Sequence, residues 1–232
     1  MKFFNSLIDE VLSLTESFPC ESFSHCGKES WSDVGYNQVI LQRDTAFELS
    51  GTGFNLVTDA ELKDEIIVVG DDLQNIIDNR FFARISLVQI ESEEDEQKAY
   101  NLIRKIEYVK YHHFPEGYMI RTSSRSHKEA VRVEKKAIKN GISFQKVGSL
   151  LIDKYKEIPS VKAVKVIFIT DPEADYGFIE SLAKKGNSIT ETLNHIMNNV
   201  KFDCDTCNLK PICDEVEGMK ELHFKNASMK EF

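Results

Sequence analysis

Three cysteines near the end of the sequence could bind a metal together. Cys204, Cys207 and Cys213 fall within ten residues, and nine residues separate Cys213 from His223. The Cys-x2-Cys unit lets two thiolates reach one metal centre from a single turn, and soft thiolates favour zinc and iron–sulfur clusters over magnesium or calcium. Three thiolates and one histidine would suit zinc, and they would equally suit a [4Fe–4S] cluster with one ligand that is not cysteine. The spacing predicts a metal site and leaves the metal open; the alternative is three reduced thiols in a poorly ordered tail.

The remaining two of the five cysteines are Cys20 and Cys26. An odd number with three members in one short window is not a disulfide framework, and in a cytosolic chain it is more typical of metal binding or catalysis. Cys20 or Cys26 could supply the fourth ligand if the N-terminal segment folded over the tail.

A short basic segment is the second candidate site. Residues 118–128 carry Arg121 and Arg125 in a chain that is otherwise acidic. The pattern Ser126-x-x-Glu129 predicts a helix that begins here, and arginines beside a helix N-terminus can bind phosphate groups. The alternative is a solvated turn without a functional role.

Composition limits the classes of function. The chain has 232 residues, which predicts one domain with appendages, and 41% of them are hydrophobic. Its net charge of −9 argues against nucleic-acid binding, which needs an excess of Lys and Arg on one face. No apolar run approaches the roughly 20 residues that span a bilayer, so we expect no membrane association. Asp9 and Glu10 interrupt the apolar N-terminus, which argues against a signal peptide and predicts a cytoplasmic location.

The periodicity of apolar residues predicts the elements that must position these sites. Helices are expected over residues 2–17, 96–109, 128–140, from Ser143 onward, after Pro172, and from Ser188 to 200. Strands are expected at residues 39–41, 66–69, 82–90 and 163–170, and residues 20–38 are expected to form a loop. This order predicts an α/β (α+β) fold: one mixed-sheet domain covered by helices, with a Cys-rich C-terminal tail. The expected boundaries are residues 1–38, 39–200 and 201–232.

Three other patterns are interpreted as structural. Five acids between Glu91 and Glu96 complement the dipole at a helix start. His112 and His113 stand at an expected helix end, where cationic side chains suit the dipole. The segment 51–53 (Gly-Thr-Gly) opens no obvious helix and is weak evidence for a nucleotide site.

The tail and the region before it resemble the β subunit of the carbon monoxide dehydrogenase/acetyl-CoA synthase complex, which is acetyl-CoA synthase itself. The resemblance covers roughly residues 40–224. Its segments follow the family's order at similar spacing: Thr45-Ala46-Phe47-Glu48-Leu49, Ile67-Val68-Val69-Gly70-Asp71-Asp72, Glu116-Gly117, Lys139-Asn140-Gly141-Ile142-Ser143-Phe144, Val164-Lys165-Val166-Ile167-Phe168-Ile169-Thr170-Asp171 and Pro211-Ile212-Cys213-Asp214-Glu215-Val216.

The resemblance implies a specific chemistry for the tail. In the family, cysteines at the positions of Cys204, Cys207 and Cys213 hold the [4Fe–4S] half of a nickel–iron–sulfur cluster, and His223 stands where the fourth cysteine would be. Tyr118 stands at an aromatic position that the family associates with coenzyme A, beside Arg121. No cysteine follows Cys213, so we expect this chain not to hold the family's nickel-binding Cys-x-Cys pair.

Three functions follow as hypotheses. The first is an iron–sulfur-binding module of one-carbon and acetyl-CoA metabolism that interacts with a corrinoid protein or another subunit of the acetyl-CoA synthase complex. The second is a CO-methylating acetyl-CoA synthase subunit that is active only with a partner chain. The third is a non-catalytic protein with structural zinc in its tail.

Overall fold

The computed structural model describes residues 2–27, 44–91, 95–111, 113–123, 127–198 and 206–228. The strands in this part of the chain are β1 (Cys20–Ser24), β2 (Thr45–Thr58), β3 (Glu65–Val69), β4 (Arg80–Ile90), β5 (Tyr118–Thr122), β6 (Lys128–Glu134) and β7 (Val161–Ile169). The helices are α1 (Asn5–Glu16), α2 (Glu96–Val109), α3 (Lys135–Lys139), α4 (Phe144–Lys156), α5 (Tyr176–Met197), α6 (Lys210–Glu215) and α7 (Met219–Ser228). None of the described helices combines the length and the apolar content needed to cross a membrane.

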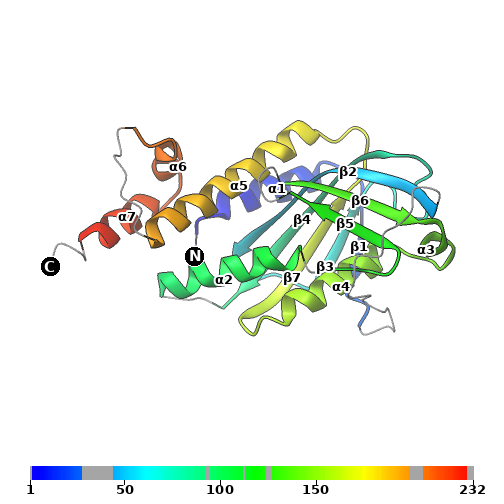
Figure 1. Ribbon diagram of the computed structural model, residues 1–232, viewed down its shortest axis with the longest axis horizontal. Helices are drawn as coiled ribbons and strands as arrows, with labels where there is room; N and C mark the ends of the chain where they lie inside the picture. Colours follow the sequence, from blue (N-terminus) through cyan, green and yellow to red (C-terminus); the bar gives the residue numbers. More distant parts are fainter. Residues whose placement is uncertain are drawn as a thin grey trace.

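The strands form one mixed sheet in the order β1-β3-β7-β4-β2-β6-β5, with helices packed on it (Figure 1). The pairs β3/β7 and β2/β4 are parallel, and the other neighbours are antiparallel. Strands near the middle, such as β7 with its run of β-branched residues, are almost fully buried, as expected for strands covered on both faces. The α/β fold predicted from the sequence is therefore confirmed.

Two neighbouring residues of β2 show which helices cover which face. Leu56 contacts α5 at Gly186, and Leu7 of α1 lies beside the same glycine. Asn55 points the opposite way, because side chains alternate along a strand, and it accepts a hydrogen bond from the hydroxyl of Tyr155 on α4 (2.7 Å). Helices α1 and α5 thus cover one face of the sheet, and α4 and α2 lie over the other.

Side-chain caps explain where three helices begin. The carboxylate of Asp95 accepts a hydrogen bond from the backbone N–H of Lys98 at the start of α2 (3.0 Å). Ser143 caps α4 in the same way, as the sequence predicted (3.2 Å), and Asp175 caps α5 (2.9 Å). Each cap satisfies a backbone donor that has no partner inside its helix.

Three expectations about local structure were wrong. Residues 20–24 form the edge strand β1, which pairs with β3, whereas the sequence predicted a loop. Residues 128–134 form strand β6 instead of the helix predicted from Ser126-x-x-Glu129, because the alternation of Glu129, Val131 and Val133 buries one face of a strand. Ser188 lies inside α5, which continues from Tyr176 to Met197 without a break, and its hydroxyl donates to the carbonyl of Lys184. The strand expected at residues 39–41 lies outside the described residues.

Gly51 belongs to the Gly-Thr-Gly segment that was weak evidence for a nucleotide site. It lies in β2, and its missing side chain allows β2 to approach β4. A Cβ atom at Gly51 would lie 1.6 Å from the carbonyl oxygen of Phe82. We expect Gly51→Ala to lower the free energy of unfolding by about 1–3 kcal/mol or more, since the two strands would have to separate. Gly186→Ala is the matched control, because its Cβ would stand 3.5 Å from Leu56, an ordinary contact. Urea unfolding of both variants checks this; equal stability of the two would contradict it.

Candidate functional site

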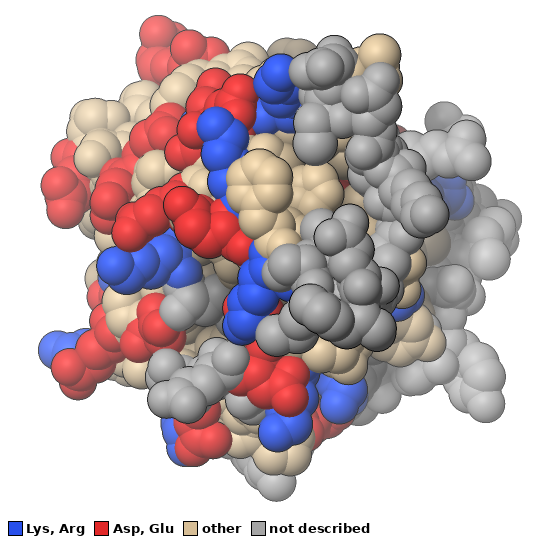
Figure 2. Space-filling model, turned by 90° about the vertical axis from the view of Figure 1, so that its left-hand side faces the viewer, with Lys and Arg blue, Asp and Glu red and all other residues tan. Residues whose placement is uncertain are grey.

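The cysteine tail packs against the end of α5. Ile212 and Cys213 of α6 contact the hydrophobic core, and Val216, Met219 and Leu222 are buried in it. Figure 1 shows α6 and α7 beside the C-terminal half of α5. Figure 2 views this end of the molecule, where charged side chains of both signs border one side of an uncharged patch. The described tail residues therefore belong to the same folded body as the sheet.

The predicted metal ligands are only partly described. Cys207 and His223 are half-buried, and so is Cys213 on α6. Cys204 lies outside the described residues. Among the residues that the structure describes, no three Cys, His, Asp or Glu side chains are grouped so that they could hold a metal ion. The donor chemistry suits an iron–sulfur cluster or zinc, but the described geometry does not assemble the ligands, and the metal site stays a prediction.

The two N-terminal cysteines lie far from the tail. Cys20 is exposed at the start of β1, and the thiol of Cys26 lies 3.1 Å from the hydroxyl of Ser149 on α4. Figure 1 shows β1 and α4 at the opposite end of the molecule from α6. If Cys20 or Cys26 supplied the fourth ligand, it would have to lie near Cys207 and Cys213. In the structure neither of the two lies there.

The basic segment lies on the β5–β6 hairpin and not at a helix start. Tyr118 is 2% exposed, and its hydroxyl has no hydrogen-bond partner among the described residues. Arg121 is exposed on the other face of β5, three residues away, and Arg125 lies outside the described residues. The structure thus separates Tyr118 from Arg121, so the two do not form one anion site.

A buried ion pair on the α4 side of the sheet was not predicted. The guanidinium of Arg84 donates to both carboxylate oxygens of Glu129, with a closest distance of 2.7 Å, and each residue is 1% exposed. Arg84 also donates to Ser86 (2.8 Å) and Asn55 (3.3 Å). Burial disfavours the charge of Arg84, but the carboxylate of Glu129 outweighs that cost and keeps the pKa of Arg84 above its ordinary value.

Gly53 makes room for this ion pair. A Cβ atom at Gly53 would lie 1.9 Å from a carboxylate oxygen of Glu129 and 3.0 Å from a guanidinium nitrogen of Arg84. The second glycine of the Gly-Thr-Gly segment is thus required by the packing of two charged side chains, and not by a phosphate group.

His113 is a second buried polar residue near this pair. It is fully buried, and neither ring nitrogen has a hydrogen-bond partner among the described residues. Burial, together with the positive charges of Arg84 and Lys154, lowers its pKa to about 3. His113 is therefore neutral at pH 7, and the expectation of a cationic residue that complements the helix dipole was wrong for His113, whereas His112 lies outside the described residues.

Hydrogen bonds connect the buried pair to the protein surface. The amide of Asn55 donates to Glu107 on α2 (3.0 Å), and Lys110 donates to the same carboxylate (2.6 Å). Lys110 is buried, yet the Glu107 carboxylate keeps its pKa above the ordinary value. Glu107 and Lys110 line a groove of about 700 Å³ between α2 and α5, together with His127.

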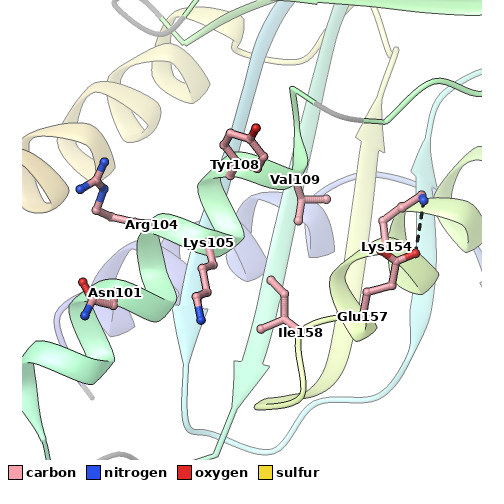
Figure 3. Close-up of a pocket in the computed structure, with 8 residues that line it drawn as sticks. All are labelled: Asn101, Arg104, Lys105, Tyr108, Val109, Lys154, Glu157 and Ile158. Atoms are coloured by element: carbon pink, nitrogen blue, oxygen red, sulfur yellow. Dashed lines mark hydrogen bonds and ion pairs between the residues drawn. The ribbon is translucent and has the colours of Figure 1, made fainter. Parts of the chain in front are cut away.

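A second groove, of about 800 Å³, lies on the other side of α2, toward α4 (Figure 3). Lys105 of α2 lines it, and across from α2 the ammonium of Lys154 forms an ion pair with Glu157 (3.2 Å). Arg104 and Tyr108 line both grooves. The exposed face of α2 is thus bordered by two polar depressions, which the sequence analysis did not predict.

A known protein family matches a large part of the chain. The family described as the CO dehydrogenase/acetyl-CoA synthase complex beta subunit matches residues 34–174, which is more than half of the chain. The matched region includes β2 to β7 and ends before Cys204, so it does not cover the tail. No curated protein matches the chain.

Proposed function

Because the chain belongs to the family of the CO dehydrogenase/acetyl-CoA synthase complex β subunit, we propose that it is an iron–sulfur-binding module of acetyl-CoA metabolism. Cys204, Cys207, Cys213 and His223 would hold a [4Fe–4S] cluster, which would transfer electrons or sense redox state. The module would act in the cytoplasm as a relative of the synthase subunit.

The packing of the tail on the family domain is the observation that carries this proposal. Cys213 contacts the core, and Cys207 is half-buried just before α6. Ligands of a cluster need such anchoring, because a mobile tail would lose more conformational entropy when it orders around the metal. Three thiolates with an imidazole are also the soft donor set that iron–sulfur clusters and zinc prefer.

A partner subunit is the second part of the proposal. The family description names a subunit of a complex, and we propose that a corrinoid protein or another subunit of that complex docks beside the tail. Phe224, on α7 next to His223, supports this, because its side chain is 66% exposed and a partner could cover it.

Metal analysis of anaerobically purified protein tests the cluster. We expect brown protein with about four irons per chain. Cys213→Ser and Cys207→Ser are expected to lose colour and iron, and His223→Gln to weaken iron retention. Cys26→Ser is the matched control and is expected to keep its iron, because Cys26 contacts Ser149 on α4, far from the tail. A Cys213→Ser protein with full iron content and colour would overturn the proposal.

The same measurement separates the alternatives. Colourless protein with one zinc and no iron would favour a structural zinc site. Nickel in a complex that co-purifies with a partner carrying a Cys-x-Cys pair would favour a CO-methylating synthase that is assembled from two chains.

A further inference from the structure

The groove between α2 and α5 is a candidate ligand site that is separate from the cysteine tail. Its volume of about 700 Å³ is in the range of small-molecule sites. Tyr100, Tyr108 and Tyr111 line it from the α2 side, and Asn187 and Asn194 line it from α5. A groove lined by aromatic rings and amides can accept a ligand that has both an apolar body and polar groups.

His127 forms a buried part of the groove and has unused hydrogen-bonding capacity. It is 7% exposed, and neither ring nitrogen has a partner that meets hydrogen-bond geometry within the described residues, although the amide of Asn187 lies close enough to the ring to offset slightly the lowering of its pKa by burial. Its backbone is held at φ 48°, a region that residues other than glycine rarely adopt. Burial and the nearby charge of Lys110 lower its pKa, so the ring is neutral at pH 7 and presents one donor and one acceptor.

Arg104 supplies a positive charge at the same groove. No carboxylate of the described residues forms an ion pair with its guanidinium, which lies 6.0 Å from the centre of the Tyr100 ring. Figure 3 shows the guanidinium on the α5 side of α2, whereas Lys105 points toward the groove beside α4. Arg104 is thus positioned to bind an anionic group in the α2–α5 groove.

The other charged groups of this groove leave Arg104 available. Lys110 is neutralised by Glu107, whose carboxylate also accepts from Asn55. Glu191 is exposed on the α5 side and leaves the groove without a large excess of either charge. An anion would therefore bind through a direct contact with the guanidinium of Arg104, and not because the groove as a whole carries a net positive charge.

We propose that the α2–α5 groove binds a small organic acid that carries a hydroxyl group and an apolar body. Its carboxylate would contact Arg104, its hydroxyl would contact His127, and its apolar part would lie on the tyrosine rings. A hydroxyl both donates and accepts, so it matches a neutral imidazole, which presents one donor and one acceptor. A carboxylate matches the two-pronged guanidinium of arginine better than it matches lysine.

Binding of three related probes to the full-length protein tests the ligand class. Mandelate has the carboxylate, the hydroxyl and a ring; phenylacetate lacks the hydroxyl, and benzyl alcohol lacks the carboxylate. By ligand-observed NMR titration we expect saturable binding of mandelate with a Kd of about 0.1–10 mM. Phenylacetate should bind about fivefold more weakly and benzyl alcohol about tenfold more weakly.

Two variants and one control assign the contacts. Arg104→Gln is expected to weaken mandelate binding by about tenfold or more, and to have little effect on benzyl alcohol. Lys105→Gln removes the neighbouring positive charge from the other groove and should leave Kd within about twofold. His127→Asn, in which asparagine tolerates the same backbone region, should remove the preference for mandelate over phenylacetate.

Three results would overturn the inference: no saturable binding of mandelate up to ~10 mM, an equal loss of affinity in Arg104→Gln and Lys105→Gln, or equal affinity of the wild type for mandelate and phenylacetate. In the last case bound water would satisfy His127. Cys213→Ser should keep wild-type affinity for mandelate, so failure of this inference is distinguishable from failure of the iron–sulfur proposal.

Discussion

Replacing Arg84 by methionine is expected to lower the free energy of unfolding by about 3–5 kcal/mol, because it leaves the buried carboxylate of Glu129 without its partner. Glu129→Gln should have a similar cost, since the guanidinium would then be the unpaired charge. Both side chains are 1% exposed, so water cannot replace the missing partner. Guanidinium chloride unfolding at pH 7, followed by circular dichroism, measures the change.

A double variant and a surface pair are the controls for this prediction. Arg84→Met with Glu129→Leu removes both charges and should be less destabilised than the sum of the single variants, which a thermodynamic cycle reveals. Lys184→Ala breaks an exposed pair with Glu180 (2.8 Å) and should leave the unfolding midpoint unchanged. Losses that simply add in the double variant would show that the two charges do not depend on each other.

Acidification from pH 7 to pH 5 is expected to remove about 2 kcal/mol of stability through His113 alone. The pKa of His113 is about 3 in the folded protein, against an ordinary value of 6.5. The unfolded chain therefore binds a proton that the folded protein excludes, and the stability present above pH 6.5 is lost progressively as the pH falls toward 3. The lowered pKa of His127 contributes with the same sign.

The variant His113→Leu tests the origin of this pH dependence. Leucine removes the group that must become protonated on unfolding, so stability should change much less between pH 7 and pH 5 than in the wild type. This window lies above the ordinary pKa values of carboxyl groups, which limits their contribution. A wild-type slope in His113→Leu would show that other groups cause the acid sensitivity, and His127→Asn would then identify the next contributor.

Elements with a strong apolar period could be predicted from the sequence. The helix that becomes α2 was predicted from Ala99, Leu102, Ile103 and Ile106, all of which are buried. The strand that becomes β7 was predicted from the mainly apolar run at residues 163–170, which only Lys165 interrupts. In α2 the spacing of the apolar residues follows from burial of one face of the helix, and in β7 the apolar run follows from burial of both faces of the strand. No tertiary contact between these elements and the described residues favours a different secondary structure.

A local motif gave a wrong prediction where its polar residue makes contacts with residues that are distant in the sequence. Glu129 completes a capping-box pattern with Ser126, but in the structure it belongs to β6 and pairs with Arg84, 45 residues earlier in the chain. An arginine within the apolar run 80–90 was the available signal of a buried charge. Its partner could not be identified, because that requires the register between β4, β2 and β6.

The candidate sites differ in how far they could be predicted. The cysteine spacing was visible in the sequence, and the family match confirms the resemblance over residues 34–174 but not over the tail. The α2–α5 groove was not predicted, because its residues come from positions 100–111, His127 and positions 187–194. Only the packing of two helices brings these segments together.

The continuous helix α5 lines the groove and contacts the cysteine tail. Its 22 residues correspond to a rod about 33 Å long, with Asn187 and Asn194 on the groove and Lys185 in an ion pair with Glu215 of α6 (3.5 Å). A break at Ser188 would have divided the lining of the groove, because Asn187 precedes it and Asn194 follows it, whereas the continuous helix carries both amides. Because loss of the metal in Cys213→Ser is expected to leave the affinity of the groove for mandelate unchanged, thermodynamic linkage requires mandelate to leave the affinity of the tail for its metal unchanged as well.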